Sequence, residues 1–432
     1  MPYIVSIPLL CVKISSAQSI DTSSRLPFTP QFNNINFLTT GVKAQQTTTV
    51  HLIHEVNNLK EKTQSTFQVQ QALKELQTEN KRDEVISSYA ITRSYWDALS
   101  VLESMLTLPD NTFSLIQAVY TVENAYLDQR IPFGTFRSLI KAKADLCKYI
   151  IRKEKLDSTD NLAKNYAIQK IFSDTVLYFD KKTNQLKKIL PFRYDFEDYK
   201  GENHWENMFV SKLLYTGKGQ CHSLPLVYLM LAEELGAKAY LSIAPEHSYI
   251  QFLDGNGKAY NFETTSDILV SNNWIMQSGF MNTSSIKQRT YMDTLDRKKL
   301  MAFIVMDLTM GYMQKFGFDD FVLQAMNKVK ELHPQNLNAL LLESNMITYQ
   351  TMAMLKAAGN PPPQKLYQYP QIYDQYQKML DIYNQIDDLG FQAMPPEAYQ
   401  SWLNQLKRRK PNSLIRNSGK AYSIIFRSII IQ

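Results

Sequence analysis

One stretch of the chain, residues 217–267, constrains the fold more than any other. It places Cys221 directly before an apolar run at 224–235, and three strand-like runs follow that run. The apolar residues recur at helical spacing and Gly236 follows them, which predicts a buried helix with a glycine C-cap. We therefore expect Cys221 in the first turn of this helix. Unpaired backbone N–H groups and the positive end of the helix dipole favour a thiolate there.

The strand-like runs predict an antiparallel hairpin. Residues 239–243, 247–253 and 258–262 alternate and are rich in strand formers. The second and third runs are joined by Asp-Gly-Asn-Gly at 254–257, which is a strong signal for a hairpin turn. His247 is therefore expected to open a strand.

This arrangement suggests the activation of a nucleophile by a general base. A thiol at a helix start, packed against a strand that carries an imidazole, allows His247 to take the proton of Cys221 and later give it to a leaving amine. A third residue would hold the imidazole ring in the correct tautomer. Glu263 and Asn261 both lie near the end of the partner strand, and both are candidates for this role.

The motifs GKGQCHSL, PEHSYIQF and NFETTSD resemble those of the transglutaminase-like superfamily, a branch of the papain-like cysteine hydrolases, over residues 205–267. The resemblance implies a papain-like core and a triad of Cys221, His247 and an acid. Glu263 stands where the family has aspartate, and Asn261 is the alternative third member. His222 stands where the cross-linking enzymes of the tissue type have tryptophan. This departure favours hydrolysis over protein cross-linking.

Residues beside the candidate nucleophile have weaker assignments. Gln220 is a candidate oxyanion donor, although the backbone N–H of Cys221 is the better one. His222 is expected to pack against the site wall, and Trp205 either covers the site or fills the core. A zinc site made from Cys221, His222 and His247 lacks the ligand spacing that such sites show, so we expect no metal.

Composition limits the remaining function classes. The chain has 432 residues and a net charge of +6, which is dispersed apart from the KRRK run at 407–410. No nucleic-acid-binding motif accompanies this run, so the expected partner is a peptide or protein substrate and not a nucleic acid. The chemistry requires no cofactor.

The N-terminal residues predict export. An apolar run within residues 1–19 is too short to span a membrane, and Ser-x-Ala before Gln18 resembles a signal-peptidase site. The protein is then expected to be periplasmic or extracellular, or cytoplasmic if this segment is not a leader. Residues 20–46 read as a linker. No other stretch approaches the length of a transmembrane span.

Helical periodicity dominates on both sides of residues 190–285, which form the predicted core domain. In the region 47–189 we expect helices at 86–108, 113–127 (with Asn111 as N-cap), 136–151 and 162–179. Acids and aromatics interleave at 122–126 and 193–198, where they either line a groove or support helix packing. The region 286–410 predicts helix pairs that loosely resemble tetratricopeptide units and offer a surface for a protein partner. The tail at 411–432 is unassigned.

The predicted fold class is therefore α+β, with a papain-like or transglutaminase-like core between largely helical flanks. The predicted function is cysteine-dependent acyl transfer at a peptide or glutamine amide bond, as a peptidase, amidase or deamidase. The alternatives are a catalytically inactive module that serves as an interaction scaffold, and a cross-linking transglutaminase.

Overall fold

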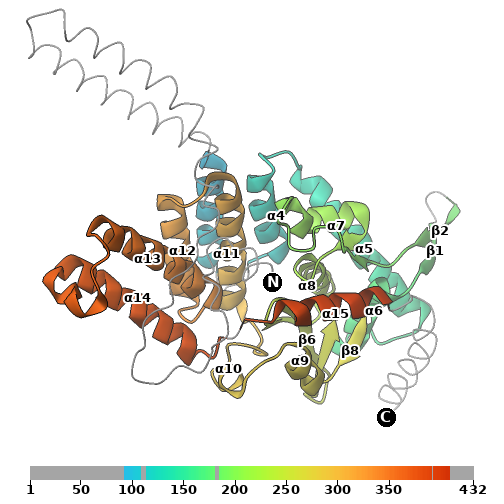
Figure 1. Ribbon diagram of the computed structural model, residues 1–432. Helices are drawn as coiled ribbons and strands as arrows, with labels where there is room; N and C mark the ends of the chain where they lie inside the picture. The colour runs from blue at the N-terminus through green and yellow to red at the C-terminus, as the bar shows by residue number, and fades with distance from the viewer. Residues whose placement is uncertain (1–91, 109–112, 181–183, 392, 409–432) are drawn as a thin grey trace, which may run out of the picture.

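The computed structural model describes residues 92–108, 113–180, 184–391 and 393–408 (Figure 1). The predicted leader, the linker, residues 47–91 of the predicted helical region and the C-terminal tail lie outside these residues. The described chain is mostly helical, with small and mainly antiparallel sheets. The α+β class is therefore confirmed at this level.

Helix α8 (Ser223–Leu235) is the central element of the fold. All its residues from Ser223 to Ala232 are buried, as expected for a helix that is apolar on every side. Gly236 follows it with a φ of 60°, in the left-handed conformation that a C-cap glycine adopts most easily. The helix and its glycine cap are confirmed, and Pro225 is accommodated because it lies in the first turn.

The main sheet has four antiparallel strands in chain order, β5 (Tyr240–Ala244), β6 (His247–Leu253), β7 (Ala259–Glu263) and β8 (Ile268–Val270). The β6–β7 connection is the predicted turn, in which the Asp254 N–H donates to the Lys258 carbonyl at 3.0 Å. The three predicted strands are confirmed to within about one residue, and His247 opens β6. Strand β8 was not predicted.

Three helices on the N-terminal side, α4 (Leu115–Tyr126), α5 (Phe133–Lys153) and α6 (Asn161–Ser173), pack around α8. A further helix at 92–106 packs instead against residues 312–321, through Tyr95. The predicted N-cap of α4, Asn111, lies outside the described residues. The observed N-cap is Ser114, whose hydroxyl accepts the N–H of Gln117.

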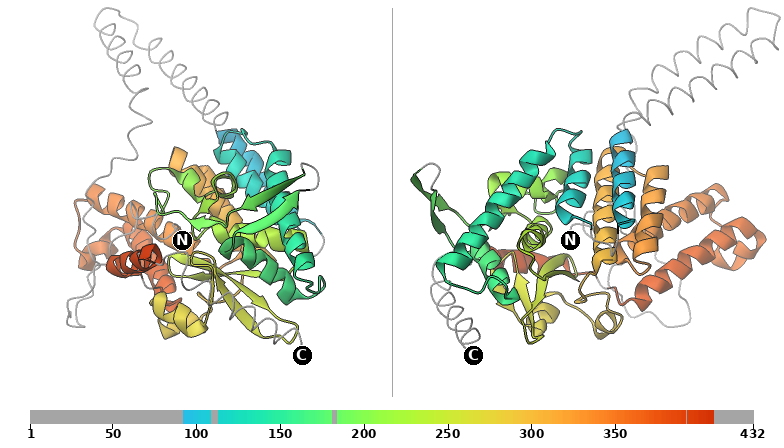
Figure 2. Two further views of the ribbon diagram at one scale, coloured as in Figure 1. Left: turned by 90° about the vertical axis from the view of Figure 1, so that its right-hand side faces the viewer. Right: turned by 180° about the vertical axis from the view of Figure 1, so that it is seen from behind.

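The prediction of a helix through 162–179 was wrong beyond Ser173. The chain instead forms β1 (Val176–Asp180), which pairs with β2 (Gln185–Ile189) in an antiparallel hairpin. This hairpin projects from one side of the molecule (Figure 2). The alternation of Val176, Tyr178 and their neighbours outweighs the helical pattern that precedes it.

Short elements lead from this hairpin to α8. Strand β3 (Arg193–Tyr194) pairs in parallel with β4 (Lys218–Gly219), and between them lie the 3₁₀ turn η2 (Trp205–Met208) and helix α7 (Val210–Thr216). After the main sheet come α9 (Asn272–Ser278) and α10 (Thr283–Lys287).

The C-terminal part contains the predicted helix pairs. They are α11 (Arg297–Phe316) with α12 (Asp320–Leu332), and α13 (Leu337–Ala357) with α14 (Pro370–Asp388), which follows the 3₁₀ turn η3 (Pro363–Gln368). Helix α11 packs against α4, whereas α13 and α14 extend away on the side opposite the β1–β2 hairpin (Figure 2). A last helix, α15 (Pro396–Arg408), lies back beside the main sheet (Figure 1).

One hydrophobic cluster links these parts. It extends through buried residues from Tyr95 to Leu389 and includes both flanks together with α8 and the main sheet. Among the helices that the structure describes, none combines the length and apolar character that crossing a bilayer requires.

Candidate active site

Cys221 lies in the turn that leads into α8. The first helical residue is Ser223 and the N-cap is His222, so the expectation of Cys221 within the first turn was wrong by two positions. The backbone nevertheless already curls at this point. The Leu224 N–H donates to the Gln220 carbonyl at 3.0 Å, and the Gln220 N–H donates to the Ser223 hydroxyl at 3.0 Å. Cys221 therefore remains close to the positive end of the helix.

A glycine allows this turn to form. A Cβ atom on Gly219 would lie 2.7 Å from the hydroxyl of Ser223 and 3.1 Å from the side chain of Leu213. Only glycine fits at such a close approach. The same residue pairs with Tyr194 in the parallel β3–β4 ladder, which brings residues 193–199 next to Cys221.

Cys221 is enclosed by the start of β6. Its side chain is buried, and the residue is only 2% exposed. The Sγ atom lies 4.0 Å from the carbonyl oxygen of Glu246, and the Cys221 carbonyl accepts a hydrogen bond from the Ser248 hydroxyl at 2.5 Å. Glu246 has a φ of 52°, a conformation that costs energy for a non-glycine residue. Two contacts thus hold the cysteine beside the residues that flank His247.

The imidazole of His247 is held from the other side by Glu263. The Nε2 atom of His247 lies 2.5 Å from Oε2 of Glu263, and the carboxylate is 1% exposed. The Oε1 atom of Glu263 accepts hydrogen bonds from the N–H and the hydroxyl of Thr265, at 2.9 and 2.8 Å. Both carboxylate oxygens are therefore used, and the orientation of the acid is fixed.

The second ring nitrogen of His247, Nδ1, does not take part in the contact with Glu263. It is buried and has no conventional hydrogen-bond partner among the described residues. The side chains of Cys221 and His247 interact closely enough that each shifts the pKa of the other. The structure thus brings Cys221, His247 and Glu263 together in the order thiol, imidazole, carboxylate.

Electrostatics within this group favour a charged imidazole. Burial alone would lower the pKa of His247, but the charge of Glu263 and the contacts with Cys221 and Glu263 raise it to about 9. Burial likewise opposes the charge on Glu263, but His247 and Thr265 hold the pKa of this carboxyl below its ordinary value. For the Cys221 thiol, burial raises the pKa, whereas the nearby charged imidazole of His247 lowers it.

Asn261, the alternative third residue, faces other partners. Its side-chain amide accepts a hydrogen bond from Gln251 at 3.0 Å and donates to Asn272 at 2.6 Å. Asn261 lies opposite Gln251 in the β6–β7 register, four positions along β6 from His247. The geometry therefore assigns the contact with His247 to Glu263.

Helix α15 covers this site, a contact that the sequence did not predict. The ring of Trp402 lies 5.1 Å from that of His247, centroid to centroid, at 65°. Tyr399 and Trp402 line a cavity of about 20 Å³ with His247 and Glu263, which leaves room for about one water molecule. The amphipathic pattern of 396–408 could have indicated a helix, but nothing local indicates where this helix docks.

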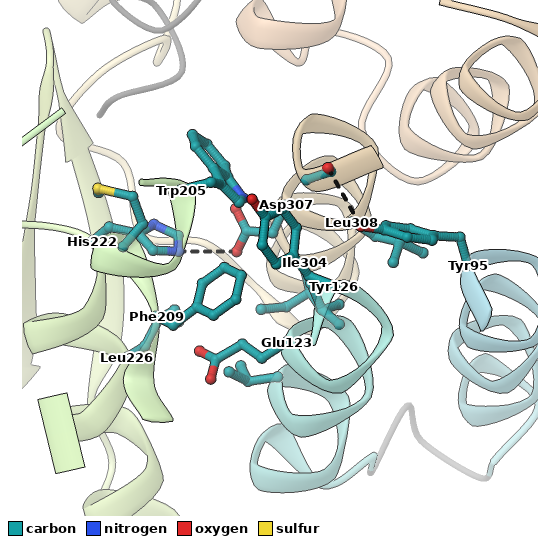
Figure 3. Close-up of a pocket in the computed structure, with 14 residues that line it drawn as sticks. Tyr95, Glu123, Tyr126, Trp205, Phe209, His222, Leu226, Ile304, Asp307 and Leu308 are labelled. Carbon is teal, nitrogen blue, oxygen red and sulfur yellow. Dashed lines mark hydrogen bonds and ion pairs between the residues drawn. The ribbon is translucent and has the colours of Figure 1, made fainter. Parts of the chain in front are cut away.

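His222 lines a second small cavity, in which its imidazole points toward Asp307 (Figure 3). Its Nε2 atom lies 3.1 Å from Oδ2 of Asp307 on α11, and its ring stacks on Phe303 at 5.3 Å. Burial lowers the pKa of His222 and raises that of Asp307. The expectation that His222 has a packing role agrees with this geometry, but the wall that it forms belongs to the second cavity.

Trp205 and Gln220 also lie away from the imidazole. Trp205 is 5% exposed and lines the second cavity beside Gly311, so it fills the space between α11 and η2. The side-chain amide of Gln220 is buried and donates to the Glu197 carbonyl at 3.5 Å. Neither residue is placed over the thiol by these contacts.

Two further observations bear on the identity of the site. Within the residues that the structure describes, no group of three or more His, Cys, Asp or Glu side chains is arranged to hold a metal ion. No protein-family model, no curated protein and no solved structure matches this chain. The geometry of the site itself is therefore the basis on which a function can be inferred.

Proposed function

We propose that the protein is a cysteine-dependent hydrolase of peptide or glutamine amide bonds, with Cys221 as nucleophile, His247 as acid and base, and Glu263 as the residue that orients the imidazole. The observation that carries the proposal is the position of His247. One ring nitrogen is bonded to a buried carboxylate. The Cys221 sulfur lies 4.0 Å from the carbonyl oxygen of the residue before His247, near enough to the imidazole to raise its pKa.

The residues provide for each step of the reaction. The Cys221 thiolate attacks the carbonyl carbon of the amide, and the C–N bond breaks as His247 gives its proton to the leaving amine. The resulting thioester is attacked by water, whose proton passes to His247. The acid product leaves, and the thiolate–imidazolium pair is restored. The Glu263 carboxylate remains ionised and therefore stabilises the positive charge of the His247 imidazolium throughout the reaction.

The same features support the resemblance to the transglutaminase-like superfamily. A cysteine turn leads into a buried helix, and the histidine and the acid follow on adjacent antiparallel strands. Hydrolysis is favoured over cross-linking because His222 stands in the place of the tryptophan of the cross-linking enzymes. Export of the protein, and binding of a partner by the α11–α14 helices, remain proposals from the sequence.

One observation favours a scaffold function instead. Cys221 is 2% exposed and α15 lies over the imidazole, so the site as it stands has no room for a substrate. An inactive module would keep this closed arrangement permanently. A hydrolase must open it.

The test is to capture the Cys221 thiolate with a peptide that carries an electrophile, which forms a stable thioether with the sulfur. The full chain, cleaved before α15 as in the experiment below, is incubated with a peptide acrylamide or vinyl sulfone, and the site of covalent addition is mapped by mass spectrometry. Addition at Cys221, abolished in Cys221→Ala and strongly reduced in His247→Ala, is expected. The matched control is Cys147→Ala, which removes a buried cysteine on α5 that is far from the site in sequence and should leave labelling unchanged. Absence of addition at Cys221 after cleavage before α15, as described below, would leave only the scaffold function.

A further inference from the structure

The helix that covers the site has the features of a docked ligand. Helix α15 follows a connection from α14 that crosses from one side of the molecule to the sheet (Figure 1). Its contacts come from one face, where Tyr399, Trp402 and Leu403 lie at the i, i+3, i+4 spacing of neighbouring positions on a helix. Leu403 is 1% exposed, whereas Gln400 and Asn404 on other faces are exposed.

The groove that receives this face is aromatic and largely separate from the main core. Met394, Tyr399 and Leu403 form a buried cluster of their own, which packs against Tyr194, Phe196 and Tyr199. Of these three, only Tyr194 also packs against the core around α8. The rings of Tyr199 and Tyr399 lie 5.6 Å apart, and those of Tyr194 and Trp402 lie 6.3 Å apart. Interleaved acids and aromatics marked this segment in the sequence as a candidate groove.

Cations flank the aromatic contacts on both partners. The ammonium group of Lys407 on α15 lies 5.3 Å from the centre of the Phe196 ring, and that of Lys200 lies 5.7 Å from the centre of the Tyr399 ring. Both are within the range of a cation–π interaction. Each partner therefore places a lysine near an aromatic ring of the other, as at a binding interface.

This docked face meets the reacting groups directly. Trp402 contacts the imidazole of His247, and Tyr399 shares a small cavity with His247 and Glu263. Cys221 lies near enough for its charge to act on the hydroxyls of both Tyr194 and Tyr399. Helix α15 thus occupies the space through which an amide would reach the thiol.

We infer that the groove lined by Tyr194, Phe196 and Tyr199 is a binding site for an amphipathic helix with aromatic residues, and that α15 is its resident occupant and blocks the reaction centre. This rests on the proposed function in one respect, namely that the covered groups are a reaction centre. A peptide or partner helix with two aromatics at this spacing competes with α15 and opens the site.

The experiment measures access to the thiol, independently of turnover. A site for a specific protease is inserted at the exposed Ala393, in the connection before α15, and the folded full chain is cleaved and diluted. Alkylation by iodoacetamide is then followed at Cys221 and Cys147 by peptide mass spectrometry. Cys147 is fully buried on α5 and reports any general unfolding.

Cleavage is expected to raise the alkylation rate of Cys221 at least about tenfold, which corresponds to about 1.4 kcal/mol, without change at Cys147. A synthetic peptide of residues 393–408 should restore protection, and the same peptide with Trp402→Ala should not. A peptide with Asn404→Ala, altered on an exposed face, is the matched control and should protect fully. Full-chain Tyr399→Ala/Trp402→Ala should reproduce the effect of cleavage.

Unchanged alkylation of Cys221 after cleavage, or equal protection by the Trp402→Ala peptide, would overturn the inference. The outcome for the proposed function is read separately. Faster alkylation without hydrolysis of any amide would support α15 as a removable cover and reject the hydrolase. Hydrolysis by the intact chain at the rate of the cleaved chain would support the hydrolase and reject the cover.

Discussion

The Nε2 atom of His222 lies 3.1 Å from Oδ2 of Asp307, so the residue directly after the candidate nucleophile is bonded to helix α11 of the C-terminal part. Both side chains are about one-tenth exposed. Phe303, one turn earlier on α11, stacks on the same imidazole. The turn that carries Cys221 is therefore fixed from two sides, by Ser248 of β6 and by α11.

Loss of the Asp307 carboxyl should destabilise the protein and loosen this turn. Asp307→Ala leaves the buried His222 without this partner, and an unsatisfied buried polar group costs about 1–3 kcal/mol. Asp307→Asn keeps a hydrogen-bonding side chain of the same size and should cost less. Unfolding by urea, followed by fluorescence, measures both. Equal stability of Asp307→Ala and the wild type would show that the pair does not hold the turn.

Replacing Glu263 should change the pH dependence of thiol reactivity. The carboxylate raises the pKa of His247 to about 9, and this raised value keeps the imidazole charged beside the thiolate at neutral pH. In Glu263→Gln that pKa should fall, so the thiolate–imidazolium pair is lost at a lower pH. If the pKa of His247 falls by one unit, the fraction of molecules with a thiolate–imidazolium pair falls about tenfold at pH values above this pKa.

The measurement is the rate of Cys221 alkylation between pH 5 and 9, in the chain cleaved before α15. Asn261→Ala is the control, because Asn261 lies two positions earlier on β7 but bonds to Gln251 and Asn272. It should leave the profile in place. A shift in Asn261→Ala and none in Glu263→Gln would reverse the assignment of the third residue.

The local parts of this site could be predicted from the sequence because local chemistry determines them. The Asp-Gly-Asn-Gly turn and the alternation of β6 and β7 act over a few residues, so His247 and Glu263 could be placed on paired strands. The choice between Glu263 and Asn261 could not be made, since both point to the same face of β7. That choice depends on the pairing register of the packed sheet, in which Asn261 lies opposite Gln251 and Glu263 reaches His247.

Contacts between segments that are distant in the sequence could not be predicted from local sequence patterns. The contact of Trp402 with His247 depends on how the chain returns from α14, and periodicity alone does not encode that path. The β1–β2 hairpin was missed for a different reason. The alternation of 176–180 was present, but the strong helical pattern before it was extended too far.

Glu123 should make the stability of the protein depend on pH. Its carboxyl is buried at the start of α7 and accepts the N–H groups of Val210 and Ser211, at 2.5 and 2.9 Å. Burial raises its pKa to about 7, against the opposing effect of these hydrogen bonds. Because the folded value exceeds the unfolded one, the protonated form favours folding. This contribution is fully present below about pH 4.5 and is lost as the pH rises through about 7.

Between about pH 4.5 and 7, the contribution of Glu123 to the free energy of unfolding should fall by up to about 3 kcal/mol, at roughly 1.4 kcal/mol per pH unit. Glu123→Gln keeps an amide oxygen as acceptor and cannot ionise, so its stability should vary less over this interval than that of the wild type. Urea unfolding at pH 5, 6, 7 and 8 compares the two slopes. Parallel curves would mean that Glu123 does not titrate in this range.

Gly390, in the connection between α14 and α15, should not tolerate substitution by a residue with a side chain. Its φ of 71° is in the left-handed region, and a Cβ atom there would lie 2.4 Å from the backbone nitrogen of Ser285. The Gly390 carbonyl also accepts a hydrogen bond from Asn282 at 3.0 Å, which fixes the connection to the loop before α10. Gly390→Ala is therefore expected to combine a conformational cost of about 1 kcal/mol with a steric clash against backbone.

Gly217 provides the matched control for this prediction. Its φ of 73° is nearly the same, but no atom outside its immediate neighbours lies within 4 Å of the added Cβ. Gly217→Ala should therefore show the conformational cost alone. Thermal unfolding of both variants separates the two effects, with Gly390→Ala the less stable. If the connection holds α15 in place, Gly390→Ala should also raise Cys221 alkylation while Gly217→Ala does not, and equal losses in the two variants would show that the contact with Ser285 relaxes freely.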